Sequence, residues 1–129
     1  MRPKFLSVDY LMLLHADLIE HYGGDAGVRD RGLLESAASQ PQAMFGGEYL
    51  HRDLAELAAA YLYHLCQNHP FIDGNKRTGA VAARVFRLMN GQRFDPDQDE
   101  YAELVLAVAS GKLDKSGATD FFRRHVRKK

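Results

Sequence analysis

The sequence of 129 residues contains a single cysteine, Cys66, and no tryptophan. One cysteine excludes an intramolecular disulfide and a zinc site built from several thiolates. No apolar run approaches the roughly 18 residues that span a bilayer, and the N-terminal residues lack the apolar stretch of a secretory signal. The 17 basic residues balance the 17 acidic ones, so no net charge attracts the chain to nucleic acid. We therefore expect a cytoplasmic protein with no membrane segment and no direct nucleic-acid binding.

Apolar residues recur mainly at helical spacing, which predicts an all-α fold in one domain, residues 1–129. Helix starts are indicated by Ser7, Asp30 and Asp53, and helix stops by paired glycines or by proline. The segment 42–51 has aromatics and glycines without a helical period, which predicts a loop or a small hairpin. The expected helices cover residues 8–22, 31–40, 54–69, 75–89, 99–110 and 116–127.

The segment between the third and fourth helices concentrates chemical groups that suit a nucleotide phosphate. Residues 69–78 read HPFIDGNKRT. Gly74 allows a tight turn of positive φ into a helix, and the first-turn amides of Gly74, Asn75, Lys76 and Arg77 then form an anion-binding terminus. We call residues 69–77 the active loop.

Side chains of the active loop add charge and a base to this terminus. Lys76 and Arg77 supply full positive charges for a transferring phosphate. Asp73 can hold Mg²⁺, which needs few protein carboxylates and shares phosphate oxygens. An imidazole titrates near neutral pH, so His69 can accept a proton from an attacking hydroxyl. Phe71 and Ile72 are expected to point into the core.

At this point the chain resembles a known family. Residues 69–77 match the H-x-F-x-D-G-N-K-R signature of the Doc (death-on-curing) toxins within the Fic/Doc superfamily, and GVRDRGLLESA at 27–37 is similar to the region before that signature. The resemblance implies a Fic/Doc fold: a compact bundle of about six helices with a small β-hairpin flap. We expect this flap at residues 42–51, where it would align a target peptide by strand addition.

The resemblance also implies roles for individual residues, with ATP and Mg²⁺ as cofactors. His69 resembles the general base, and Asp73 resembles the metal ligand. The residues implied to be catalytic are His69, Asp73, Lys76 and Arg77, and those implied to bind the nucleotide are Gly74, Asn75, Lys76 and Arg77.

Two positions separate the two branches of the superfamily. The Fic branch, which transfers AMP, has glycine where this chain has Lys76 and an arginine where it has Ala80. The Doc branch transfers the γ-phosphate of ATP to a threonine of elongation factor Tu and arrests translation. The resemblance therefore implies an ATP-dependent protein Ser/Thr kinase that acts as the toxin of a type II toxin–antitoxin system.

Control by a separate protein is also implied. Many Fic proteins carry an inhibitory helix with Ser/Thr-x-x-x-Glu-Gly/Asn, and this string does not occur in the chain. We therefore expect an antitoxin partner, Phd-like or another.

Three alternative functions are also considered. They are a transferase of a nucleotidyl or phosphocholine group, a catalytically silent binding module, and a zinc site at His64, Cys66 and His69. The intact His69 and Asp73 argue against the silent module. The zinc site is disfavoured because histidines five residues apart do not share a helix face.

Overall fold

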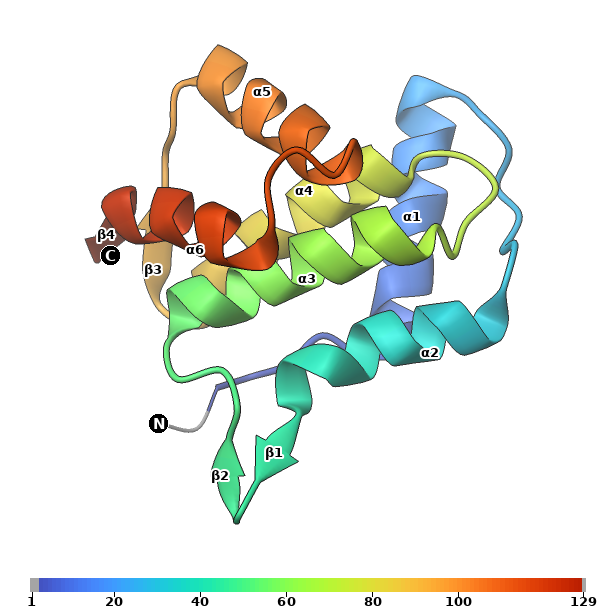
Figure 1. The fold of residues 1–129 in the computed structure, drawn as a ribbon. Coiled ribbons are helices and arrows are strands. Elements are labelled where there is room, and N and C mark those ends of the chain that lie inside the picture. Colours follow the sequence, from blue (N-terminus) through green and yellow to red (C-terminus); the bar gives the residue numbers. More distant parts are fainter. Residues whose placement is uncertain (1–2, 129) are drawn as a thin grey trace.

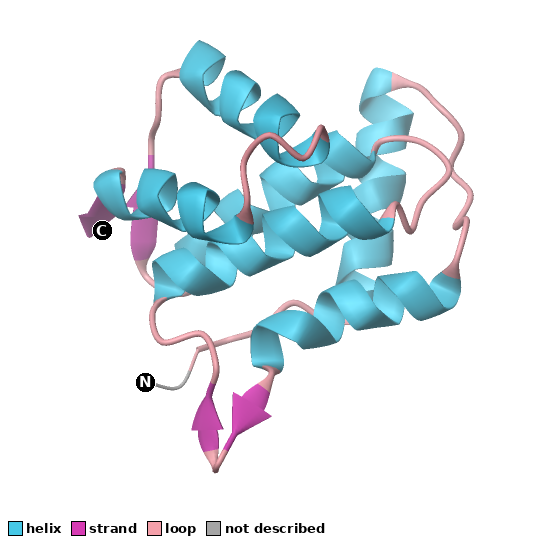
Figure 2. Ribbon diagram, in the orientation of Figure 1, coloured by secondary structure: helices cyan, strands magenta, loops and turns pink. Residues whose placement is uncertain are grey.

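The computed structural model describes residues 3–128, so residues 1, 2 and 129 of the expected domain lie outside it. The chain forms a bundle of helices (Figure 1), and the strands occur as two small pairs at its edges (Figure 2). This arrangement confirms the all-α prediction. The elements are α1 (Val8–Tyr22), α2 (Arg31–Ser39), a 3-10 turn (Gln40–Gln42), β1 (Met44–Phe45), β2 (Glu48–Tyr49), α3 (Leu54–Asn68), α4 (Asn75–Met89), β3 (Gln92–Phe94), α5 (Gln98–Ala109), α6 (Lys115–Arg124) and β4 (Val126–Lys128).

Short polar side chains fix where the helices begin. At five helix starts a side-chain oxygen accepts a hydrogen bond from the backbone N–H three residues later, which satisfies one donor that the first turn leaves free. α4 is the exception, because glycine precedes it and no side chain caps it. The five capping residues are Ser7, Asp30, Asp53, Asp97 and Asp114.

α3 lies at the centre of the fold and packs against α2, α4, α5 and α6. Its closest neighbour is α4, which approaches through small residues. A Cβ atom added at Gly79 would lie 3.3 Å from Leu62 Cδ1 and 3.5 Å from Cys66 Sγ, so glycine permits this approach. Burial raises the pKa of the Cys66 thiol to about 12, consistent with a small apolar core residue rather than a reactive thiolate. Among residues 3–128, no helix combines the length and the apolar character that crossing a bilayer requires.

The structure corrects the predicted end of the sixth helix and the predicted burial of Ile72. The sixth helix was expected to reach residue 127, but it ends at Arg124, and Val126–Lys128 pairs antiparallel with Gln92–Phe94. Strands of three residues are too short to produce a recognisable alternation of apolar residues. Ile72 was expected to point into the core, but its side chain is half exposed.

The hairpin expected within 42–51 exists as β1 and β2, but it does not lie beside the active loop. Figure 1 shows it beyond the N-terminal end of α3, whereas the active loop follows the C-terminal end. The 15 residues of α3 separate these two ends by about 22 Å, at about 1.5 Å per residue. The segment that contacts the active loop is instead residues 24–30, which we call the strap.

Candidate active site

The active loop begins and ends with residues in the left-handed backbone conformation. His69 ends α3 with φ 47° and ψ 55° and is the one non-glycine residue of positive φ in the described part of the chain. Gly74 opens α4 with φ 78°, as the sequence predicted. A histidine in this conformation is strained by about 1–2 kcal/mol, and such residues concentrate at functional sites.

Asn75 closes the loop onto itself through its side chain. Its Oδ1 accepts from the Phe71 N–H at 3.0 Å, and its Nδ2 donates to the Phe71 carbonyl at 2.9 Å. The Asn75 side chain is buried, so it shapes the loop, and only its backbone N–H remains available to a ligand. The side-chain role was not anticipated, because the sequence predicted only a backbone contact with an anion.

The same Asn75 amide fixes the resting state of His69. Nδ2 of Asn75 lies 3.2 Å from Nδ1 of His69 and can only donate, so Nδ1 is the acceptor. The proton of a neutral His69 ring therefore lies on Nε2. In this state no ring nitrogen offers a free lone pair, and proton acceptance requires His69 to turn away from Asn75. The His69 side chain is exposed and has room to do so.

A buried histidine of α1 holds the other end of the loop. His15 Nε2 donates to the carbonyl of Asp73 at 2.8 Å, and the His15 ring stacks on Phe71 with 3.7 Å between ring centroids. Both aromatic side chains are buried. The sequence did not identify His15, because a histidine on the apolar face of a helix has the same pattern as any core residue.

The strap (residues 24–30) fixes the outer side of the loop. The backbone N–H of Asp25 donates to Oδ2 of Asp73 at 2.9 Å, and the N–H of Ile72 donates to the Gly27 carbonyl at 3.0 Å. Val28 and Phe71 form an isolated antiparallel bridge. These contacts hold the Asp73 carboxylate in one place.

Arg29 of the strap completes the end of α3. Its Nε donates to the His69 carbonyl at 2.6 Å and its Nη2 to the Asn68 carbonyl at 2.8 Å. Because the last carbonyls of a helix have no partner within it, Arg29 both satisfies them and fixes the backbone of His69. Sequence reasoning missed Arg29, although it lies within the segment that carried the resemblance.

The start of α4 has backbone donors that could bind an anion. Within residues 3–128, no side chain accepts from the N–H groups of Asn75, Lys76 or Arg77. Such a terminus carries about half a positive charge, and the exposed side chains of Lys76 and Arg77 add to it. The guanidinium of Arg77 lies 4.3 Å above the ring of Tyr22, which holds it near the end of α1.

The residues present fit a magnesium ion next to a bound phosphate. Oδ2 of Asp73 accepts from the strap, while Oδ1 accepts no hydrogen bond from the described residues. Mg²⁺ prefers one or two carboxylates together with phosphate oxygens and water, and a single exposed carboxylate with one free oxygen satisfies that preference.

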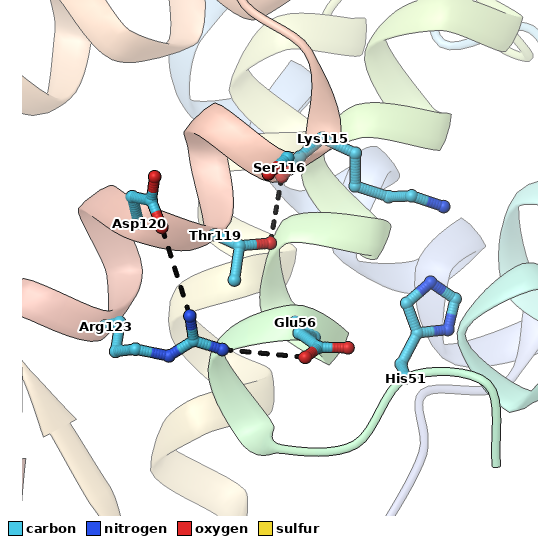
Figure 3. A pocket seen from close by; sticks show the side chains of 7 residues that line it. All are labelled: His51, Glu56, Lys115, Ser116, Thr119, Asp120 and Arg123. Carbon is cyan, nitrogen blue, oxygen red and sulfur yellow. Dashed lines mark hydrogen bonds and ion pairs between the residues drawn. The ribbon is translucent and has the colours of Figure 1, made fainter.

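A hollow of about 270 Å³ lies at the end of α3 opposite the active loop. Figure 3 shows the side chains of His51 and Lys115 pointing into it, with Glu56 and Arg123 on another side. Burial and the nearby Lys115 lower the pKa of His51, and the same causes lower the pKa of His64 to about 4. Lys115 Nζ lies 3.3 Å from Nε2 of His64, which therefore acts as acceptor in its neutral form. Acidic and basic side chains line this hollow together, and this mixture favours a structural role over the binding of one charged ligand.

Comparison with known proteins identifies relatives over most of the chain. The family model described as "Fic/DOC family" matches residues 5–87, which include α1, the strap and the active loop. The chain is 36% identical to "Protein kinase doc" of Escherichia phage P1 over 122 residues, which cover 94% of each chain. It is 41% identical to "Toxin Doc" of Mycolicibacterium smegmatis over 95 residues, 72% of this chain and 73% of that relative.

Proposed function

The chain belongs to the Fic/DOC family, and from this premise we propose that it is a toxin with protein kinase activity. It transfers the γ-phosphate of ATP to a Thr or Ser hydroxyl of a translation factor, for which elongation factor Tu is the first candidate. Two relatives support the proposal through their names, which describe a protein kinase and a toxin. We also propose that it acts in the cytoplasm, where a translation factor is found.

One observation carries the proposal: the imidazole of His69 and the uncapped start of α4 belong to one rigid loop. Three sets of contacts hold this loop in a single shape: the hydrogen bond between Asn75 and Phe71, the hydrogen bond from His15 to Asp73, and the contacts of the strap. Phosphoryl transfer needs positioning and charge stabilisation more than covalent chemistry from the protein. A fixed cationic terminus with an adjacent base supplies both.

The proposed reaction proceeds in line at the γ-phosphorus. The His69 ring first turns away from the Asn75 amide and then accepts the proton of the target hydroxyl. The oxygen of that hydroxyl forms a bond to the γ-phosphorus. The bond from that phosphorus to the β–γ bridging oxygen breaks, and ADP leaves. The N–H groups at the start of α4, with Lys76 and Arg77, stabilise the charge on the phosphate oxygens. A magnesium ion held by Asp73 would neutralise part of that charge when bound.

Position 76 favours transfer of the γ-phosphate. A lysine here places side-chain bulk and charge along the path that the pyrophosphate of an AMP donor would take. The ammonium of Lys76 instead suits a terminal phosphate held at the helix start. We also propose that an antitoxin, Phd-like or another, restrains the activity, because the chain contains no inhibitory Ser/Thr-x-x-x-Glu-Gly/Asn string.

The test uses ATP labelled at the γ- or the α-phosphate, with Mg²⁺ and purified elongation factor Tu. We expect γ-label on the target and none from the α-labelled ATP, and no transfer by His69→Ala. Transfer of the α-label would identify an AMP transferase, and no transfer of either label would indicate a binding module. Persistence of transfer in His69→Ala would show that another group is the base.

A further inference from the structure

One face of α1 lies along the end of the active loop and the first turn of α4. Residues 15, 19 and 22 share this face, because they are separated by four and then three positions of a helix. Each of their side chains meets a later position of the loop or of α4. The pairs, in chain order, are His15 with Asp73, Ile19 with Gly74, and Tyr22 with Arg77.

The middle contact allows the two helices to approach each other closely. A Cβ atom added at Gly74 would lie 3.3 Å from Ile19 Cδ1, so glycine lets the last turn of α1 pack against the start of α4. Tyr22 is three residues after Ile19, and Arg77 is three residues after Gly74. Both therefore lie nearly one helical turn beyond the contact, where the aromatic ring meets the guanidinium.

Tyr22 holds Arg77 by the face of its guanidinium and not through its N–H groups. The Cζ atom of Arg77 lies 4.3 Å from the centroid of the Tyr22 ring, within the roughly 6 Å range of a cation–π contact. Among residues 3–128, no group accepts a hydrogen bond from the Arg77 side chain, and no carboxylate lies within 4.0 Å of its nitrogens. The cation–π contact is therefore what orients this side chain.

An arginine held in this way is suited to bind phosphate. The five N–H donors of Arg77 lie in the plane of the guanidinium, and a ring on the face of that plane blocks none of them. A long exposed side chain without a partner samples many rotamers, and a ligand loses affinity when it has to order such a side chain. The Tyr22 ring restricts Arg77 before any ligand binds.

The same contact contributes little to the stability of the fold. Tyr22 is 65% exposed, and the side chain of Arg77 is exposed as well. Cation–π contacts at exposed sites are weak, and little apolar surface is removed from water here. The position of the contact, beside the free N–H groups at the start of α4, favours a role in ligand binding.

We propose that Tyr22 is a positioning residue for Arg77 and that it raises the affinity of the chain for the phosphates of ATP. Tyr22 keeps the guanidinium beside the first N–H groups of α4, where its two-pronged set of donors binds two phosphate oxygens. This inference rests on the proposed function for the identity of the ligand. Its test uses a ligand that requires no transfer step.

Binding of inorganic tripolyphosphate with Mg²⁺ is measured by isothermal titration calorimetry. Tyr22→Leu keeps an apolar side chain but removes the ring, and it should weaken binding about two- to fivefold. Tyr22→Phe keeps the ring and should bind with nearly the wild-type affinity. Tyr10→Leu, at a 38% exposed tyrosine of the same helix, is the matched control and should not change the affinity. Urea unfolding of Tyr22→Leu should match that of the wild type, because residue 22 is exposed.

A double-mutant cycle shows whether Tyr22 acts through Arg77. Arg77→Gln should weaken binding of tripolyphosphate by about tenfold, because a charge-assisted contact is lost. In the Arg77→Gln background, Tyr22→Leu should cause no further loss, since no guanidinium remains for the ring to hold. An equal loss from Tyr22→Leu in both backgrounds would overturn the inference, because Tyr22 would then act on the ligand without Arg77. Equal losses in Tyr22→Phe and Tyr22→Leu would also overturn it, because the hydroxyl and not the ring would then be responsible.

The outcomes separate this inference from the proposed function. If the wild type transfers the γ-phosphate of ATP, but Tyr22→Leu binds tripolyphosphate normally, the positioning role is overturned and the kinase proposal survives. If Tyr22→Leu weakens binding as expected, but the wild type transfers no phosphate, the positioning role stands and the kinase proposal fails. If the wild type binds neither tripolyphosphate nor ATP, both proposals fail.

Discussion

His15 and Asp73 are 58 residues apart in the chain and are joined by a hydrogen bond of 2.8 Å from the buried imidazole to the loop carbonyl. The residue proposed to hold Mg²⁺ therefore has its backbone fixed by α1 and its carboxylate fixed by the strap. Since reacting groups must be placed to within a fraction of an ångström, we propose that His15 is a positioning residue for the proposed chemistry, which it does not contact.

His15→Phe tests this positioning, since phenylalanine can keep the stack on Phe71 but cannot donate to Asp73. We expect the free energy of unfolding to fall by about 1–3 kcal/mol, because the carbonyl loses its partner. Transfer of γ-phosphate should fall by about tenfold to a hundredfold with little change in KM for the target. Urea unfolding and labelled ATP measure the two effects. His21→Phe, on the exposed side of the same helix, should leave kcat unchanged, and equal losses in both variants would contradict the role of His15.

His69→Gly separates the proposed catalytic role of the His69 side chain from the conformational strain of its backbone. Glycine adopts positive φ freely, so the variant should be as stable as the wild type or more stable by up to about 1 kcal/mol. The same substitution removes the proposed base and should abolish transfer. His69→Ala keeps the strained backbone and should be the less stable of the two inactive variants, as measured by urea unfolding. A large loss of stability in His69→Gly would show that the side chain supports the fold.

Asp73→Asn removes the charge of the proposed magnesium ligand and leaves an oxygen to accept from Asp25. The loop should keep its shape, so the free energy of unfolding should change by less than about 1 kcal/mol. The Mg²⁺ concentration for half-maximal transfer should rise about tenfold or more, since one carboxylate supplies most of the protein's contribution. A magnesium titration of transfer measures this. Asp120→Asn, at an exposed carboxylate of α6, is the control, and identical titrations for the two variants would remove Asp73 from the metal site.

Lys76→Gly tests whether this side chain selects the transferred group. We expect γ-phosphate transfer to fall by about tenfold or more, because a full charge at the phosphates is lost, and the removed bulk opens the path required for AMP transfer. The ratio of α-label to γ-label on the target is the measurement. Lys112→Gly removes a lysine from an exposed turn and should leave the ratio unchanged. An unchanged ratio in Lys76→Gly would show that position 76 does not determine the chemistry.

The sequence predicted most of the fold because its signals are local. The caps at Ser7, Asp30 and Asp53 and the positive φ of Gly74 each depend on neighbouring residues, and the structure confirms them. The short sheet of β3 and β4 depends on pairing between distant segments, and three residues carry too little pattern to predict that pairing.

The candidate site was predicted only as far as its motif extends. Residues of the active loop are contiguous, so their types could be interpreted together. His15 and Arg29 contact the loop from α1 and the strap. A single sequence does not reveal which backbone carbonyl either side chain will contact. The hairpin at 42–51 was recognised as a hairpin, but its distance from the active loop follows from the length of α3 and from the packing of α2 against it.

The stability of the fold should depend on pH through the histidines at the far end of α3. Burial, Lys115 and His51 together lower the pKa of His64 to about 4, and burial and Lys115 lower that of His51. In the unfolded chain both titrate near pH 6.5, so below this pH the unfolded state binds more protons. The contribution of these two histidines to the free energy of unfolding is therefore complete above about pH 6.5 and is lost as the pH falls toward 4.

Urea unfolding between pH 7.5 and 4.5 measures this loss in the wild type and in His64→Gln. Glutamine can still accept from Lys115 but does not titrate, so the variant should lose less stability over this range than the wild type. His21→Gln is the control, because His21 is exposed and its bond to the Asp17 carbonyl raises its pKa, which gives a contribution of the opposite sign. A loss in His64→Gln as steep as in the wild type would mean that His64 is not protonated on unfolding, and the acid sensitivity would then belong to the carboxylates at the helix caps.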